Sequence, residues 1–311
     1  MLLFILRRLF LTIPTALGVV TVVSLMIHAI PGDPVDSLLG EFASLEEKQL
    51  LSQQLGLDLP IWQQFLKYLS GVCRGDLQNS LIYHKPVSSL IAQRIFPTVE
   101  LAILAIITAI LISIPSGIMS ALCKGKKSDL MIMTFSMLGV AVPNFWLGPM
   151  LILIFSLTLG WLPVSDRSGL SSYILPVLTL GTSLAAILSR MTRNSVLECL
   201  KEDYIRTAKA KGQRHVLIMA VHVMGNAALP LISVIGLQFG VLLTGAVITE
   251  KIFDWPGLGS LMLDGLGQRD YPLVQGCVLF FSFSYLLVNL LTDLAYAYID
   301  PRISLYRSED S

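Results

Sequence analysis

Charged residues are scarce in this 311-residue chain. Only 14% of its residues are charged, whereas soluble proteins have about 25%. Hydrophobic residues make up 54%, and the mean hydropathy is +0.72. A soluble domain of this length needs far more polar surface to cover its core. The net charge of +1 gives no reason to expect a nucleic-acid partner. The composition therefore predicts a membrane protein with lipid around it.

Sequence signatures of catalysis are missing as well. There is no His-Glu-x-x-His, no Gly-x-Ser-x-Gly, no phosphate-binding loop ending in Gly-Lys-Ser/Thr and no Cys-x-x-Cys. His215 and His222 could share a helix face, but two ligands do not make a metal site. The four cysteines are placed so that no two meet on the oxidising side, and we expect no intrachain disulfide. We expect no enzyme activity, no ATP hydrolysis and no cofactor or metal bound by this chain.

Apolar runs recur along the chain, and a helix needs roughly 20 such residues to cross a hydrocarbon core of about 30 Å. The third run carries Gly139, Pro143, Gly148 and Pro149, so we expect a kinked or broken helix there. The sequence predicts an all-α membrane protein with six transmembrane helices, at residues 9–30, 96–122, 130–159, 173–188, 229–248 and 272–299.

The distribution of lysine and arginine predicts the orientation, because cytoplasmic loops are enriched in them. With both termini in the cytoplasm, most of the 22 Lys and Arg residues lie inside: Arg7, Arg8, Lys124, Lys126, Lys127, Arg190, Arg193, Lys201, Arg206, Lys209, Lys211, Arg214, Arg302 and Arg307.

Arg7 and Arg8 also allow a second interpretation, a twin-arginine export signal. The apolar stretch behind them, residues 9–30, is longer than the 7–15 residues typical of a signal, and no clear cleavage site follows. A membrane-spanning helix is the favoured interpretation.

The long external loop, residues 31–95, is predicted to fold into a cap. It opens with the turn-forming Pro31-Gly32-Asp33-Pro34. Ser44-Leu45-Glu46-Glu47 is typical of a capping box, starting a helix that ends at Gly56. Pro60 begins another helix with four apolar residues on one face, Ile61, Phe65, Leu66 and Leu69. The cap could be an interfacial hairpin without a role in passage, or it could contact substrate.

The cytoplasmic segment 194–228 is helical in pattern, basic and rich in small residues. The positive-inside rule alone explains the basic residues. It does not explain small residues, which leave a polar helix with a shallow surface suited to docking on another protein. Gly212 supplies a helix stop. The candidate docking residues are Asp203, Tyr204, Arg206, Thr207, Ala208, Lys209, Ala210 and Gly212.

Ionisable residues are nearly absent from the centres of the apolar runs. Glu100, Arg190, Glu250 and Asp293 lie near the ends of the runs, and Asp293 is the deepest. Ion-coupled transporters usually carry such groups at mid-membrane, so ion-coupled transport is disfavoured. For Asp293 we expect a capping or packing role near the inner interface.

The fifth run has a face of small residues, and small faces let membrane helices approach closely. The face could pack within this subunit, form a seam with a second subunit or line a translocation path. Its members are Ser233, Gly236, Gly240 and Thr244.

The segment from Asp203 to Gly212, with Asn226-Ala227 and Leu229-Pro230 after it, resembles the cytoplasmic motif of binding-protein-dependent ABC importer permeases. More narrowly, the chain resembles the first permease subunit of the dipeptide/oligopeptide/nickel group, which includes glutathione importers. The resemblance runs the whole length, with further matches at residues 7–8, 30–34, 55–58, 75–77, 97–101, 143–146, 161–163, 174–176, 190–193, 253–259, 269–272 and 300–302.

Two features depart from the family pattern. The general motif begins Glu-Ala-Ala, whereas this chain has Arg206-Thr207-Ala208 and a longer gap before Leu229-Pro230. The peptide/nickel group tolerates this form, so the docking role carries over. Gln78-Asn79-Ser80 stands where the family more often has a glycine-containing turn, which affects detail of the external cap.

The resemblance implies a single permease domain over residues 1–311, with the fold of type I ABC importers, in the bacterial inner membrane. It implies as partners a second, paralogous permease, two ABC ATPase subunits that bind ATP and Mg²⁺, and a periplasmic or lipoprotein substrate-binding protein. The expected substrate is a short peptide, such as a dipeptide or glutathione, with nickel or a metal chelate as the alternative. A channel or insertion factor of another class is a further alternative, and co-purification with an ATPase would separate the two.

Overall fold

The computed structural model describes residues 2–29, 35, 44–56, 58–164, 167 and 169–299, and these are almost entirely helical. One isolated bridge, between Asn79 and Pro86, is the only extended pairing among them. The longer helices are α1 (Leu2–Ala29), α5 (Val87–Leu122), α6 (Lys127–Ala141), α8 (Ile174–Cys199), α11 (Met224–Ile252) and α13 (Tyr271–Ile299). The shorter ones are α3 (Leu45–Leu55), α4 (Ile61–Cys73), α7 (Asn144–Leu151), α9 (Asp203–Ala210), α10 (His215–Leu217) and α12 (Leu258–Gly267). Two π-helical turns, Ile152–Thr158 and Ile218–Val223, and one 3₁₀ turn, Leu170–Tyr173, complete the described part.

Helices dominate because a lipid-embedded backbone must satisfy its own hydrogen bonds. By length and composition, four helical stretches could cross a membrane: Val87–Leu122, Leu170–Cys199, His215–Leu243 and Tyr271–Ala295. The bent pair Lys127–Ala141 and Asn144–Thr158 makes a fifth if it counts as one span, and Phe10–Leu25 is a shorter apolar helix. The all-α membrane class is confirmed, and the count of six remains a prediction.

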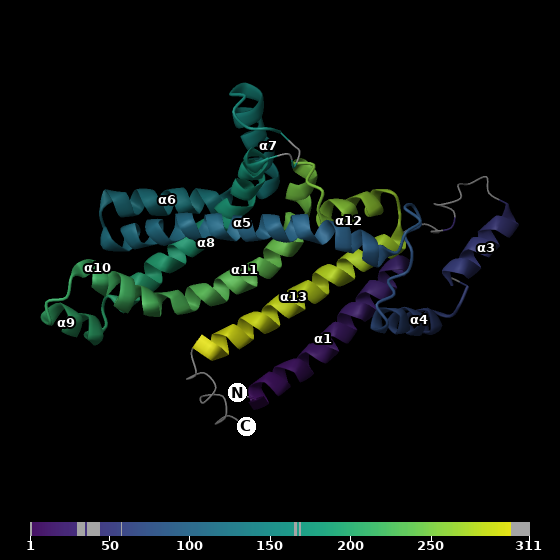
Figure 1. Ribbon diagram of the computed structural model, residues 1–311, viewed down its shortest axis with the longest axis horizontal. Helices are drawn as coiled ribbons and strands as arrows, with labels where there is room; N and C mark the ends of the chain where they lie inside the picture. Colours follow the sequence, from purple (N-terminus) through teal and green to yellow (C-terminus); the bar gives the residue numbers. More distant parts are fainter. Residues whose placement is uncertain are drawn as a thin grey trace.

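The predicted break in the third apolar run is confirmed. The chain bends by 102° between α6 and the helix that begins at Asn144. Val142, just before Pro143, takes extended backbone angles, because a proline ring disfavours the helical conformation of the residue before it. As a result α7 leaves the bundle at a steep angle (Figure 1).

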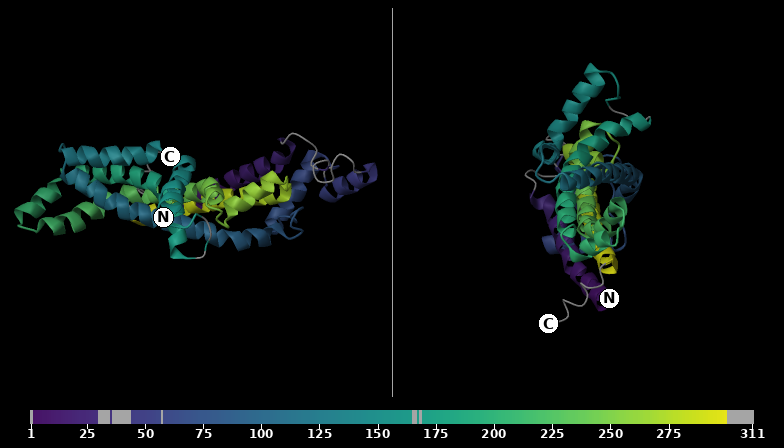
Figure 2. Two further views of the ribbon diagram at one scale, coloured as in Figure 1. Left: turned by 90° about the horizontal axis from the view of Figure 1, so that it is seen from above. Right: turned by 90° about the vertical axis from the view of Figure 1, so that its left-hand side faces the viewer.

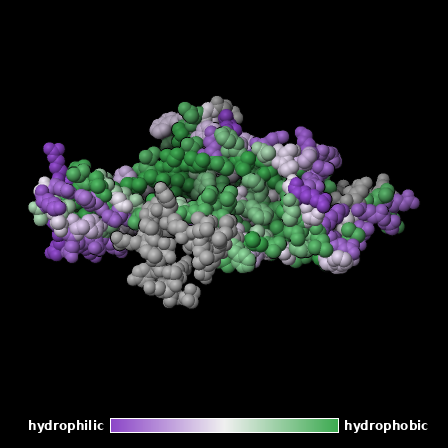
Figure 3. Space-filling model, turned by 60° about the horizontal axis from the view of Figure 1, so that its bottom comes forward, coloured by the Kyte–Doolittle hydropathy of each residue, from purple (hydrophilic) through white to green (hydrophobic). Residues whose placement is uncertain are grey.

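The molecule is elongated, and its two ends differ in content. α9 and α10 lie at one end of the long axis, whereas α3 and α12 lie toward the other (Figures 1 and 2). Hydrophobic residues cover most of the middle, and hydrophilic residues gather at the two ends (Figure 3). This distribution matches an apolar band that sits in lipid.

The centre of the bundle is formed by α5 and α8, with α11 packed against them. Leu101 and Ala105 of α5 and Leu180 of α8 are buried in one cluster. A Cβ atom at Gly181 would lie 3.0 Å from the backbone oxygen of Ala105. Small residues therefore bring these two backbones close together, as is common between membrane helices.

The small face of α11 packs within this subunit at two positions. A Cβ atom on Gly236 would lie 2.5 Å from Cγ2 of Thr292, and one on Gly240 would lie 2.7 Å from Cδ2 of Tyr285. Both partners belong to α13. Ser233 is half-buried, and the side chain of Thr244 lies outside the described part. Of the three possibilities left open, packing within the chain applies to the two glycines.

The segment predicted to be external, residues 31–95, contains the two predicted helices. α3 begins at Leu45 and ends before Gly56, whose φ of 72° suits glycine, and α4 follows Pro60. The predicted apolar face of α4 is partly wrong, because Ile61 and Leu66 are 53% and 52% exposed. The face that packs against α1 and α13 consists of Phe65, Tyr68, Leu69 and Val72. The predicted turn at residues 31–34 lies outside the described residues.

Polar residues near the ends of the bundle pair with one another. Arg8 of α1 lies 2.7 Å from Asp293 of α13, so Asp293 forms an ion pair within the chain; its capping or packing role near the inner interface stays a prediction. Glu250 is fully buried and accepts hydrogen bonds from the Thr98 hydroxyl at 2.6 Å and the Ser260 backbone at 3.0 Å. Nearby, the Trp255 indole donates to the Pro97 backbone oxygen at 3.0 Å and the Leu258 backbone donates to the Thr98 hydroxyl at 2.8 Å. These two bonds join two stretches that carry the family resemblance, residues 97–101 and 253–259.

The contact of α11 with α13 predicts opposite effects for two glycine substitutions in α11. Gly236→Ala forces its new methyl against Thr292, and overpacking costs about 1–3 kcal/mol. Gly225→Ala meets nothing within 4 Å and gains up to about 1 kcal/mol of helix propensity. We expect a lower apparent melting temperature for Gly236→Ala and an unchanged or higher one for Gly225→Ala. The measurement is the fraction of detergent-purified protein that stays monodisperse after heating. Equal melting temperatures would contradict the close approach of α11 and α13.

Candidate functional site at helix α9

Helix α9 is a short segment at one end of the molecule, joined to the end of α8 by a turn (Figure 1). Asp203 lies in its first turn and Lys209 in its last, an arrangement that complements the helix dipole. The helix ends where the sequence predicts, because Gly212 takes a φ of 72° after the last turn.

One face of α9 is buried against the rest of the chain. Ile205 has no exposed surface and Ala208 is 6% exposed. The two residues are three apart, which places them on the same side of a helix. They form a cluster with residues from α5, α8, α11 and the π-helical turn before α11, namely Ala121, Val196, Ala227, Ile218 and Val223. We call this set the α9 anchor.

Tyr204 adds a polar attachment beside the α9 anchor. Its side chain hydrogen-bonds with the side chains of Cys199, at the end of α8, and Asn226, near the start of α11. Burial, and then the hydrogen bond with Cys199, raise the pKa of Tyr204 to about 12. The phenol therefore stays protonated at physiological pH. Asn226 also donates to the His222 backbone oxygen at 2.8 Å, which holds the amide in place.

The opposite face of α9 is exposed. It presents the small, polar and charged residues that the sequence nominated for docking: Asp203, Arg206, Thr207, Lys209, Ala210 and, after the helix, Gly212. Asp203 and Arg206 lie 3.6 Å apart and are almost fully exposed. Such surface pairs contribute little to stability, so both charges remain open to another protein.

Ala208 does not belong to that exposed face. The sequence suggested that its small side chain keeps the docking surface shallow, and this prediction is wrong. Ala208 points into the α9 anchor, where a small residue lets α9 lie close to the bundle. Thr207, Ala210 and Gly212 are the small residues that the exposed face retains.

A second attachment near this end was not predicted. Arg193 of α8 donates to both carboxylate oxygens of Asp129 in α6, each at 2.8 Å. Asp129 also accepts hydrogen bonds from the Ser120 hydroxyl and, at 3.0 Å, from the Gly125 backbone. The charge pattern assigned Arg193 only to the basic cytoplasmic set. Asp129, the one acidic residue in the first turn of α6, was the available signal.

Within the described part of the chain, no group of three or more His, Cys, Asp or Glu residues is placed to hold a metal ion. His222 lies 3.0 Å from the side-chain oxygen of Gln213.

Two stretches of the chain match known families. Residues 113–305 match the family described as the inner membrane component of binding-protein-dependent transport systems. Residues 1–102 match the N-terminal part of the membrane component of such systems.

Individual relatives match over nearly the whole length. The glutathione transport system permease protein GsiC of Salmonella paratyphi A is 43% identical, over 97% of this chain and 99% of its own length. The protein of the same name from Escherichia coli K12 is 41% identical over the same shares.

Solved structures share the fold at low sequence identity. An inward-facing structure of the MetNI methionine ABC transporter matches with a TM-score of 0.56 at 15% identity, over 68% of this chain and 96% of that one. An amino acid ABC transporter matches with a TM-score of 0.50 at 16% identity, over 69% and 94%.

The α9 anchor predicts a contrast between two neighbouring alanines. Ala208→Trp must fit a large ring into a packed cluster, at a cost of about 1–3 kcal/mol. Ala210→Trp lies on the exposed face and should change stability by no more than about 0.5 kcal/mol. The check is the heating assay described above, applied to both variants. Equal stability of the two variants would show that Ala208 is not buried in the folded protein.

Proposed function

We propose a function from the family of this chain, which belongs to the inner membrane components of binding-protein-dependent transport systems. It is a multi-pass permease subunit of an ABC importer in the peptide and glutathione group, and not itself an enzyme. Membership in this family removes the alternative of an unrelated channel or insertion factor.

The proposed substrate is a short peptide, with glutathione and dipeptides as the first candidates. The observation that carries this choice is the 43% identity to a glutathione permease over 97% of the chain. Nickel or a metal chelate is the competing substrate within the same group.

The proposed partners are a second, paralogous permease that completes the path, a substrate-binding protein and two ATPase subunits. ATP and Mg²⁺ would bind to the ATPases and no cofactor to this chain. The exposed face of α9 would dock on an ATPase through Thr207, Ala210 and Gly212, with Arg206 and Lys209 orienting the approach. Support comes from the two-sided character of α9, which is attached to the bundle on one face and open on the other.

The proposed arrangement has six membrane spans and both termini in the cytoplasm of a bacterial cell. Residues 194–228 would then be cytoplasmic and residues 31–95 external. Two observations support this: the lysine and arginine distribution, and the placement of α9 and α3 toward opposite ends of the molecule (Figure 1). Transport would proceed by switching between inward- and outward-facing states that ATP and substrate bias differently.

Uptake by a strain that lacks only this gene tests the proposed function. We expect loss of radiolabelled glutathione or Ala-Ala uptake, restored by a plasmid copy, with unchanged accumulation of radioactive nickel. The same strain carrying the gene of an unrelated permease is the control. Normal peptide uptake with lost nickel accumulation would replace the peptide with nickel as the substrate.

A further inference from the structure

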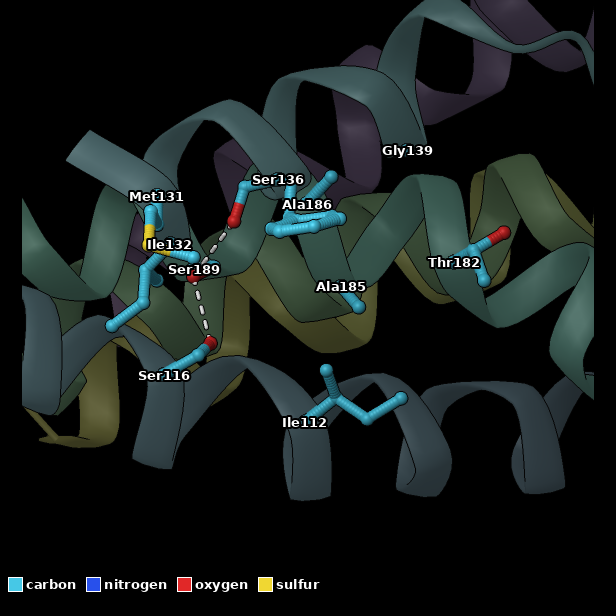
Figure 4. A pocket seen from close by; sticks show the side chains of 11 residues that line it. Ile112, Ser116, Met131, Ile132, Ser136, Gly139, Thr182, Ala185, Ala186 and Ser189 are labelled. Carbon is cyan, nitrogen blue, oxygen red and sulfur yellow. Dashed lines mark hydrogen bonds between the residues drawn. The ribbon is translucent and has the colours of Figure 1, made fainter. Parts of the chain in front are cut away.

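A cavity of about 420 Å³ lies between α5, α6 and α8 (Figure 4), and no residue of the α9 anchor lines it. Its volume falls within the roughly 300–1,000 Å³ typical of small-molecule sites. Most of its wall is apolar. The polar side chains of the wall are those of Thr182 and of three serines from three different helices, Ser116 of α5, Ser136 of α6 and Ser189 of α8.

The three serines form a connected chain of hydroxyl groups. The Ser136 hydroxyl donates to Ser189 Oγ at 3.3 Å, and Ser189 Oγ lies 2.8 Å from Ser116 Oγ (Figure 4). The Ser116 hydroxyl donates to the backbone oxygen of Ser113 at 3.1 Å. Either atom of the Ser116–Ser189 contact could be the donor; because the Ser116 hydrogen already serves the Ser113 bond, we assign the shared hydrogen to Ser189.

This assignment leaves the cluster rich in acceptors. A hydroxyl has one donor and two acceptor lone pairs, and all three donors are in use. Ser136 accepts no hydrogen bond within the chain of serines, so both of its lone pairs are available there. Ser116 and Ser189 each keep one. The cavity therefore offers hydrogen-bond acceptors and favours a ligand that brings N–H donors.

The rest of the cavity wall does not discriminate strongly between ligands that carry N–H donors. Apart from Thr182, whose hydroxyl donates to the Thr179 backbone oxygen, the rest of the wall is apolar, with residues such as Ile112, Ile132, Phe135 and Ala186. A lipid chain has no donor to offer the serine oxygens, whereas a peptide has amide N–H groups and an ammonium group. Apolar walls with few polar groups accommodate varied side chains, as a path for different short peptides requires.

Helix α8 is held on both sides of the cavity. The Asp129–Arg193 pair joins it to α6 at one end, and at the other the Ser183 hydroxyl donates to Oδ1 of Asn144, the first residue of α7, at 2.8 Å. Between them a Cβ atom at Gly139 would lie 3.1 Å from Cβ of Ala186. The helices that carry Ser136 and Ser189, α6 and α8, are thus held against each other beside the cavity.

We propose that this cavity is a binding position for the peptide inside the permease, where Ser116 and Ser136 accept hydrogen bonds from its N–H groups. The inference rests on the proposed function, because it takes a short peptide as the substrate. Ser189 positions the two, since it is almost fully buried and links them.

Hydrogen bonding is tested by removing the acceptor and the donor in turn. Cells carry this permease with its native partner subunits and take up radiolabelled Ala-Ala or the same dipeptide methylated on its amide nitrogen. We expect Ser116→Ala with Ser136→Ala to lower Ala-Ala uptake about 2- to 12-fold for each lost hydrogen bond. The same two substitutions should lower the uptake of the methylated peptide by a distinctly smaller factor. Any preference of the substrate-binding protein for one peptide over the other does not affect the result. The uptake of each peptide is compared between the wild-type permease and the variant, and the binding protein is the same in both. As a control, Thr134→Ala, at an exposed position of α6, the helix that carries Ser136, should leave the uptake of both peptides unchanged.

Equal losses for the two peptides would show that the serines only hold the helices together, and the inference would fall. Uptake of Ala-Ala at the wild-type rate would also overturn it. Absence of peptide uptake by the wild type would instead contradict the proposed function itself, so the two failures are distinguishable.

Blocking the cavity gives an independent test. Ser136→Trp should fill the space and lower Ala-Ala uptake about 5- to 150-fold, from an occlusion cost of about 1–3 kcal/mol. Met137→Trp, one residue along and 65% exposed outside the cavity, should transport normally. Membrane levels of both proteins are measured by immunoblot. If Ser136→Trp does not accumulate in the membrane, the uptake by the protein with Ser116→Ala and Ser136→Ala decides whether the cavity binds peptide. Normal uptake by an inserted Ser136→Trp protein would show that the cavity faces lipid.

Discussion

The burial of Ile205 and Ala208 beneath α9 is the interaction on which this account of the molecule depends. A helix of eight residues is not stable alone in water, so packing must set its position. The α9 anchor joins it to α5, α8 and α11 at once, and Tyr204 adds hydrogen bonds to the same ends. A force applied to the exposed face of α9 is therefore delivered to three long helices together.

The bundle to which α9 is anchored is tightly packed along some helix contacts and hollow between others. The Asp129–Arg193 pair joins α6 to α8, and the hydrogen bond from Ser183 to Asn144 joins α8 to α7. Glycines bring α11 close to α13. In lipid such pairings persist because polar groups have few other partners. Rigid pairs of helices that shift against one another provide the discrete states that a transporter needs. The cavity between α5, α6 and α8 lies inside one of these stiff units.

Local signals in the sequence were sufficient for some features and not for others. Pro143 predicted the break after α6, and Gly212 predicted the end of α9, because both act on the backbone of neighbouring residues. The inward position of Ala208 and the pairing of Asp129 with Arg193 were not predicted. Both depend on which helix lies opposite, and residues 64 apart in the sequence give no local sign of contact. The exposure of Ile61 in α4 was not predicted for the same reason, because the packing of α1 and α13 against α4 determines which of its faces is buried.

The ratio of peptide transported to ATP hydrolysed tests the central claim most directly. Ile205→Ala leaves the exposed face of α9 intact and removes most of a fully buried side chain from the α9 anchor, a change that typically costs about 2–5 kcal/mol. With the assembled importer in proteoliposomes, we predict that the ATPase subunits still co-purify and hydrolyse ATP, while transport per ATP falls well below that of the wild type. Lys201→Ala, on the exposed flank of the same segment, should keep the wild-type ratio. An unchanged ratio for Ile205→Ala would contradict the account, because α9 would then transmit force without its anchor.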